Sequence, residues 1–175
     1  MDFWHLITNR RSIRQYQPKA VEAERVDQIM EAALRAPSSQ NLQPCEFIAV
    51  TDPEVIGELA KARPRTSILS GAPLAMVICV DPEKCDVWIE NAAIAATFIC
   101  LAAEALDLGH CWLQIRERRH SPEQTAEDFV RKVLQIPAQL RVVSIIAIGY
   151  PAEEKVGHPR EELKFEKIHQ DIYGN

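Results

Sequence analysis

The sequence predicts an α+β fold, in which helices pack on a small mixed, mainly antiparallel sheet and the C-terminus forms an extended arm. Three observations predict it: segments with helical apolar periodicity, short continuous apolar runs typical of buried strands, and a charged final stretch. The chain has 175 residues, of which 47% are hydrophobic, so residues 1–175 are expected to form a single domain with a substantial core.

Four helices other than the central one are expected along the chain. Asp2 is expected to cap a first helix that ends near Asn9. In residues 22–37, EAERVDQIMEAALRAP, apolar side chains recur every three or four positions, and the final proline ends the helix. A short helix is expected to begin at PEVIGEL, residues 53–59, and a later one at SPEQ, where Ser121 would be the N-cap.

Strands are expected where short apolar runs lie between these helices. The runs are CEFIAV (45–50), PLAMVICV (73–80), CWLQI (111–115) and LRVVSIIAIG (140–149), of which the last has the strongest strand pattern. Continuous apolar runs of this length are typical of strands that are buried on both faces.

The segment 86–109, DVWIENAAIAATFICLAAEALDLG, is expected to form a helix that is apolar nearly all round from Ala92 to Ala103. The uninterrupted apolar part is too short for a membrane span, and polar residues stand at both ends. A helix that is apolar on every side must be covered on every side, by its own domain or by a second copy. We therefore expect this helix to lie at a subunit interface.

Composition narrows the function classes. The formal net charge is −5 and the isoelectric point is about 5.6, which argues against nucleic acid as a partner. The N-terminus is amphipathic and lacks the apolar run of a signal peptide. The five cysteines form no CxxC pair, so we expect a reducing, cytoplasmic environment and no zinc or iron–sulfur site.

The final stretch, residues 151–175, is charged and carries scattered apolar residues. Their spacing suits an extended arm that lies across another surface better than it suits a compact element. These residues are Leu163, Phe165, Ile168, Ile172 and Tyr173.

The stretch RRSIR, residues 10–14, places three arginines around one serine at the expected end of the first helix. One interpretation is simple capping, because cations complement the negative end of a helix dipole. The other is a phosphate site, because guanidinium groups and a hydroxyl match the charge and acceptor oxygens of a phosphate monoester. The chain has 6 glycines and no glycine-rich phosphate loop, so side chains would have to bind any phosphate.

Two further stretches could contribute to a site. APSSQNLQP, residues 36–44, is either an ordinary polar turn or a set of neutral donors and acceptors suited to the edge of a heterocycle. In LGHCWLQI, residues 108–115, Trp112 suits core packing. His110 and Cys111 are neighbours on a strand and point to opposite faces, so they form a poor nucleophile pair.

Together these stretches resemble the nitroreductase family of FMN-dependent oxidoreductases. RRSIRQY, APSSQNLQP, the alanine-rich central helix running into LGHCW, and GYP before a charged tail occur in the family's order and cover essentially the whole chain. The resemblance implies a nitroreductase-like homodimer with one FMN at each of two interface sites, each built from both subunits. It also implies that residues 151–175 wrap the partner subunit.

The resemblance also implies roles for individual residues. Arg10, Arg11 and Ser12 would contact the phosphate and ribityl chain, and Arg14 would be the cation near the pyrimidine end of the flavin. The partner subunit would supply three contacts, a backbone N–H would be aimed at flavin N5, and a basic residue in the tail would close on the phosphate. The partner's contacts are Ser38, Ser39 and Asn41; the N5 position is Gln114 and Ile115; and the basic residue is Arg160 and, less closely, His158.

The implied activity is a ping-pong transfer of reducing equivalents from NAD(P)H through flavin N5 to a small oxidant such as a nitroaromatic or a quinone. No side chain need act as acid or base, so no catalytic residue is assigned. Cys45 stands where the family usually has a large aromatic residue, and the chain lacks the insertion that commonly forms a lid. The alternatives are another flavin reaction on the same scaffold (dehalogenation, azoline oxidation or flavin fragmentation) and a non-enzymatic FMN- or nucleotide-binding module.

Overall fold

The computed structural model describes residues 2–64, 66 and 68–175, and it confirms the α+β fold class. The four strands form one sheet in the order β1-β2-β4-β3, and every neighbouring pair is antiparallel. Outside these strand pairs, Ser12 forms an isolated parallel bridge with His110 of β3. The strands are β1 (Cys45–Val50), β2 (Leu74–Val80), β3 (Gly109–Gln114) and β4 (Arg141–Gly149).

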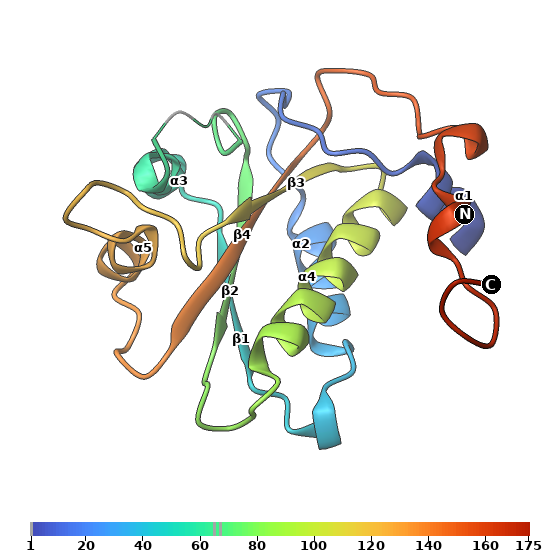
Figure 1. The fold of residues 1–175 in the computed structure, drawn as a ribbon. Coiled ribbons are helices and arrows are strands. Elements are labelled where there is room, and N and C mark those ends of the chain that lie inside the picture. Colours follow the sequence, from blue (N-terminus) through green and yellow to red (C-terminus); the bar gives the residue numbers. More distant parts are fainter. Residues whose placement is uncertain (1, 65, 67) are drawn as a thin grey trace.

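Helices cover both faces of this sheet (Figure 1). The pair α2 and α4 packs on one face, and α3 and α5 pack on the other, while α1 lies apart beside the end of α4. The helices are α1 (Phe3–Asn9), α2 (Ala23–Leu34), α3 (Pro53–Leu59), α4 (Trp88–Ala105) and α5 (Ala126–Leu134).

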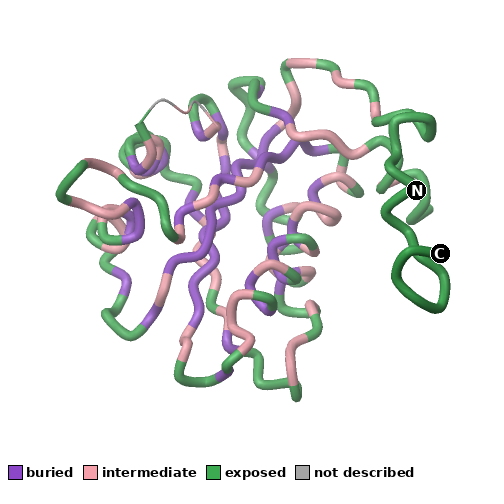
Figure 2. Tube along the Cα trace, in the orientation of Figure 1, coloured by how far each residue is buried: buried purple, intermediate pink, exposed green. Residues whose placement is uncertain are grey.

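The core consists of two layers separated by the sheet. Every residue of β2 is buried, and alternate side chains enter different layers: Met76 and Ile78 face α2 and α4, whereas Val77 and Cys79 face α3 and α5. Figure 2 shows the central strands as the most buried part of the trace. Burial on both faces explains why the strands are continuous apolar runs rather than alternating ones.

The predicted start of α5 was wrong. Ser121 Oγ accepts hydrogen bonds from the backbone N–H groups of Glu123 (3.2 Å) and Gln124 (3.1 Å), so it closes a local turn. The helix begins four residues later, where Thr125 is the N-cap and its Oγ1 accepts from Asp128 N at 3.0 Å. Serine and threonine side chains can both accept hydrogen bonds from backbone N–H groups at a turn or at a helix start. Here Ser121 stabilises a turn and Thr125 caps the helix.

The central helix α4 packs one face on the sheet and leaves another uncovered. Its buried residues are mostly small ones, which let the helix lie close to the strands. On the opposite face Ile94 is 37% exposed, and Thr97 is also exposed. Among the described residues α4 is the one helix whose length and composition would suit a membrane span, and a third (33%) of it is buried inside the protein.

The C-terminal segment leaves the sheet after β4 and lies beside α1 (Figure 1). Gly157 lies so close to α1 that a Cβ there would clash with the carbonyl oxygen of Thr8. From residue 158 onward all residues are exposed, with short 3-10 turns at Arg160–Glu162 and Phe165–Lys167. The segment is therefore irregular and its apolar side chains are uncovered, as expected for an arm.

Candidate functional site

The RRSIR stretch runs alongside β3 directly after α1. Ile13 N donates to the His110 carbonyl at 2.9 Å, next to the bridge between Ser12 and His110. The close approach requires glycine at position 109, because a Cβ there would lie 2.8 Å from Cγ2 of Ile13. The stretch is thus fixed to the sheet by its backbone, which leaves the arginine and serine side chains for other contacts.

A cavity of about 400 Å³ opens between α1, α4 and β3. It brings the predicted residues Arg10 and Ser12 together with Trp112, His110 and Leu101. A volume of this size falls within the range of small-molecule sites, and walls that are mostly apolar with a few polar groups are typical of them. The cation and hydroxyl suit an anionic group, and the aromatic and aliphatic wall suits a flat apolar body.

The remaining arginines of the stretch contact the chain just after β4. The guanidinium group of Arg11 donates to the Val156 carbonyl, and the backbone N–H of Arg14 donates to the Glu153 carboxylate at 2.6 Å. Lys155 Nζ donates to the Ser12 carbonyl at 3.0 Å and lies 3.0 Å from the same carboxylate. The Arg14 N–H and then Lys155 lower the pKa of Glu153.

Sequence reasoning missed Lys155, although the structure places it directly beside the RRSIR stretch. It follows the GYP turn by four positions, which was the one signal in the sequence. Its contact with Ser12 spans 143 positions in the chain, so only the path of β4 brings the two together. Lys155 thus contacts the backbone of the stretch at Ser12, and it lines a second cavity together with Arg11 and its ion-pair partner Glu153.

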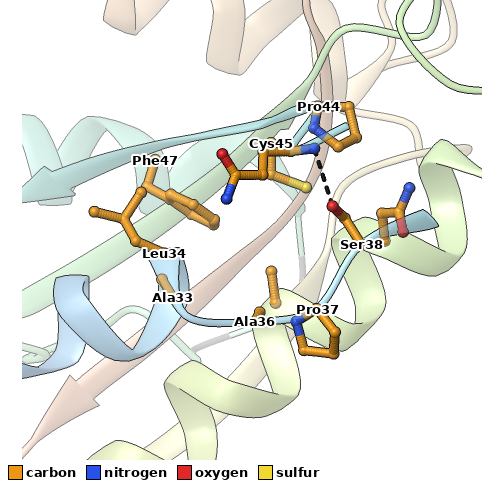
Figure 3. A pocket seen from close by; sticks show the side chains of 11 residues that line it. Ala33, Leu34, Ala36, Pro37, Ser38, Pro44, Cys45 and Phe47 are labelled. Carbon is orange, nitrogen blue, oxygen red and sulfur yellow. Dashed lines mark hydrogen bonds between the residues drawn. The ribbon is translucent and has the colours of Figure 1, made fainter. Parts of the chain in front are cut away.

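The loop 36–44 lies at the other end of α4. Ser38 Oγ accepts from Gln43 N at 2.9 Å (dashed line in Figure 3), and Ser39 N donates to Oδ1 of the buried Asn91 at 3.0 Å. The backbone is left-handed at three non-glycine residues in this loop: φ is 50° at Gln40, 56° at Asn41 and 46° at Gln43. The loop is therefore a defined structure rather than a loose turn.

A cavity of about 270 Å³ lies under this loop. Figure 3 shows Leu34 and Phe47 on one side of it, with Cys45 beside Pro44 and Ser38 across from them. Cys45 occupies the position at which the resemblance led us to expect a large aromatic side chain, and its thiol lines the cavity. Burial raises the pKa of Cys45 to about 11, so the thiol is protonated at neutral pH.

Within one chain, the loop residues Ser38 and Ser39 do not lie beside Arg10 and Ser12. The loop residue Ser39 contacts Asn91 in the first turn of α4, whereas Arg10 and Ser12 share their cavity with Leu101. Ten residues of helix separate Asn91 from Leu101, which is about 15 Å. Ser38 and Ser39 therefore line a different part of the molecule from Arg10 and Ser12.

The remaining predicted site residues, Gln114, Ile115 and Arg160, contact other residues of the same chain. Gln114 Oε1 accepts from Trp112 Nε1 at 3.0 Å. Ile115 is fully buried, and its backbone N–H donates to the Val143 carbonyl at 3.1 Å, so this N–H has a partner within the chain. The Arg160 guanidinium lies 4.6 Å from the centre of the Phe165 ring, in the exposed arm.

The buried thiols are poor nucleophile candidates. Burial raises the pKa of Cys100 and of Cys79 to about 12, and burial also raises the pKa of Cys111, opposed by the charge of Arg14. The thiolate is the reactive form, so these groups are inert at neutral pH.

Comparisons with known proteins find relatives that match most of the chain. The Nitroreductase family model matches residues 7–76 and 62–150. A protein of Archaeoglobus fulgidus with the provisional name NADH dehydrogenase/NAD(P)H nitroreductase is 32% identical over 171 residues, which is 95% of each chain. The FMN reductase [NAD(P)H] of Bacillus subtilis is 31% identical over 194 residues, covering 97% of this chain and 73% of its own.

A solved structure is also similar. The FMN-dependent nitroreductase of Clostridium difficile R20291 has a TM-score of 0.93 and 43% sequence identity, covering 96% of this chain and 98% of its own.

Proposed function

We propose, from the premise that this chain belongs to the nitroreductase family, that it is an FMN-dependent oxidoreductase that takes reducing equivalents from NAD(P)H and passes them to a small oxidant. The observation that carries the proposal is the cavity shared by Arg10, Ser12 and Trp112. The FMN-dependent nitroreductase of C. difficile and the FMN reductase of B. subtilis support the cofactor and the reductant.

The residues present fit FMN. A phosphate monoester carries close to two negative charges, and the Arg10 guanidinium and the Ser12 hydroxyl supply matching donors in the same cavity. Arg11 and Lys155 line a second cavity, where Arg11 donates to the Val156 carbonyl and Lys155 pairs with Glu153. Arg14 supplies a cation farther along the same stretch, where it would stabilise negative charge on a reduced ring. When bound, FMN supplies an acceptor for hydride from NAD(P)H and a donor of electrons to the second substrate.

We propose that the functional unit is a homodimer with two sites that each use both chains. The separation of Ser39 from Arg10 and Ser12 along α4 supports a dimer. A two-fold axis across the exposed face of α4 would place the start of one α4 helix beside the end of the other, and so bring Ser39 of one chain near Arg10 of the second. The uncovered Ile94 lies on that face, and the exposed apolar residues of the arm would find cover on the second chain. The loop residues Ser38, Ser39 and Asn41 would reach a cofactor held by Arg10 only in such a dimer, because they lie at the other end of α4.

The proposed reaction is ping-pong, with nitroaromatics and quinones as the oxidants. One open face of a bound flavin would serve both partners in turn, so no side chain of this chain need act as general acid or base. The thiols of Cys79 and Cys100 are protonated at neutral pH, which is consistent with a pathway in which the chain binds, orients and tunes the cofactor. Its expected location is the cytoplasm.

The test begins with the purified chain and added FMN. We expect a yellow protein that retains flavin through gel filtration and is bleached by NAD(P)H in the absence of oxygen. A screen of nitroaromatics, quinones and halogenated aromatics would then show which oxidant restores the colour. A protein that takes up no FMN would refute the proposal, and one that retains FMN without bleaching would be a binding module.

A further inference from the structure

Two arginine-rich segments of the sequence meet at the end of β3, where the structure describes residues 61–64 of the first and 116–120 of the second. KARPR (61–65) and RERRH (116–120) contain six of the chain's 20 lysines and arginines and one acidic residue, although the whole chain is acidic. The Nδ1 atom of His120 lies within hydrogen-bond distance of the Lys61 carbonyl, at 2.8 Å. The His120 ring also stacks on Phe129 with the ring centres 4.1 Å apart, so the second segment is held in place.

Some of these charges are neutralised and some are not. Lys61 pairs with Glu58 at 2.5 Å, and Arg116 pairs with Glu117 at 2.6 Å. The guanidinium groups of the other described arginines donate to backbone carbonyls: Arg63 to Gln114 at 3.3 Å, Arg118 to Glu117 at 3.1 Å, and Arg119 to Pro122 at 3.2 Å. We call Arg63, Arg118 and Arg119 the arginine cluster.

The arginine cluster contacts the backbone of Gln114 and Ile115 at the end of β3. Arg63 contacts the carbonyl of Gln114, and Arg118 N donates to the carbonyl of Ile115 at 3.0 Å. Gln114 and Ile115 are the residues at which the family resemblance places flavin N5. Arg118 and Arg119 are exposed, so a ligand that extends outward from N5 could reach them.

We infer that the arginine cluster binds the 2′-phosphate of NADPH and makes the protein prefer NADPH to NADH. The inference rests on the proposed function. When the nicotinamide lies over N5, the adenosine end of the dinucleotide must lie at a distance from it, beyond the end of β3. NADPH carries a phosphate monoester on that end, and its charge matches guanidinium groups that lack carboxylate partners among the described residues. Arginine near the adenosine ribose is a general means of accepting a 2′-phosphate.

The test is the double variant Arg118→Gln/Arg119→Gln. Both changes leave the backbone bonds of Arg118 with Ile115 and Ala126 intact, so the turn should be retained. The matched control is Lys84→Gln/Lys132→Gln, which removes the same charge from exposed positions outside the cluster. The probes are adenosine 2′,5′-bisphosphate and adenosine 5′-monophosphate, titrated by calorimetry into the FMN-loaded proteins.

We expect the wild type and the control to bind the bisphosphate about tenfold more tightly than the monophosphate, and the double variant to lose that preference. In steady state the double variant should lose about tenfold in kcat/KM for NADPH and less than about threefold for NADH. A wild type without preference, or a double variant that keeps it, would overturn the inference. Flavin absorbance of the same samples tests the proposed function separately, because FMN can be retained whether or not the bisphosphate is preferred.

Discussion

The central strands and the two ends of the chain differ in how far a single chain covers its own apolar residues. In β2 and β4 nearly every side chain is buried between two helical layers. In α1 and the C-terminal arm, by contrast, Phe3 and Trp4 are 63% and 67% exposed, and Ile168 is 70% exposed. Isoleucine occurs in both regions, so residue type alone does not decide burial. The difference shows that the core is complete within one chain and that the ends are not.

The largest expected effect compares one isoleucine from each region. Ile146→Ala in β4 should lower the free energy of unfolding by about 2–5 kcal/mol, because it leaves a cavity at a fully buried position. Ile168→Ala in the arm should change it by less than about 0.5 kcal/mol when the chain is monomeric. Urea denaturation at low protein concentration measures both.

The same pair also tests what covers the arm. If a second copy covers it, the cost of Ile168→Ala should grow with protein concentration, while that of Ile146→Ala should not. Equal costs for the two variants at every concentration would contradict the exposure of the arm.

The next effect concerns the end of α1. Arg10→Ala should weaken FMN binding by about 1–3 kcal/mol, the scale of a lost charge-assisted hydrogen bond. The control is Arg35→Ala, which removes an exposed arginine paired with Glu31 on α2. Fluorescence titration of FMN measures the affinity, and unchanged flavin retention in Arg10→Ala after dilution would contradict the proposed phosphate contact.

A mixing experiment asks whether two chains complete one site. Ser39→Glu places a carboxylate in the loop 36–44, and we expect both it and Arg10→Ala to bind FMN weakly as homodimers. In a mixed dimer one site combines both changes and the other has neither. Equimolar mixing and reassembly should therefore restore roughly one quarter of the high-affinity sites. No recovery after verified subunit exchange would count against a site built from both chains.

The smallest effect lies where the root of the arm meets the segment before α2. The Tyr150 hydroxyl donates to the Glu22 carboxylate at 2.6 Å, and this bond is the main reason that the pKa of Glu22 falls to about 2. Because folding lowers this pKa, the contribution to stability is present above about pH 4.5 and is lost as the pH falls toward 2.

Glu22→Gln should therefore lower Tm slightly at pH 6 and leave it unchanged near pH 2, and Tyr150→Phe should behave in the same way. Thermal melts across that range provide the measurement. A difference between wild type and variant that persists at the acid end would exclude this carboxylate as its cause.

Much of the fold could be predicted from the sequence, because burial on both faces produces continuous apolar strands and packing on one face produces the periodicity of α2. The error at Ser121 arose because serine at a turn and serine at a helix start look alike, and Thr125 could equally be the cap. Such choices depend on which backbone groups are free, and the sequence does not contain that information.

The candidate site was predictable in part. Arg10 and Ser12 line one cavity, as their adjacency suggested. The N–H of Ile115 donates to Val143, which only strand pairing could reveal, and its role toward a flavin stays a prediction. Lys155 was missed because it lies far along the sequence from Ser12, which it contacts. The arginine cluster was missed because two segments that are distant in the sequence form it.

The left-handed backbone of the loop 36–44 has a consequence for binding. Such a conformation costs non-glycine residues about 1–3 kcal/mol each, and here it is maintained by the bonds from Gln43 to Ser38 and from Ser39 to Asn91. The entropy of ordering the loop is therefore lost when the chain folds, not when a ligand arrives. A ligand that meets this loop finds a preorganised surface, and its affinity is not reduced by the cost of arranging it.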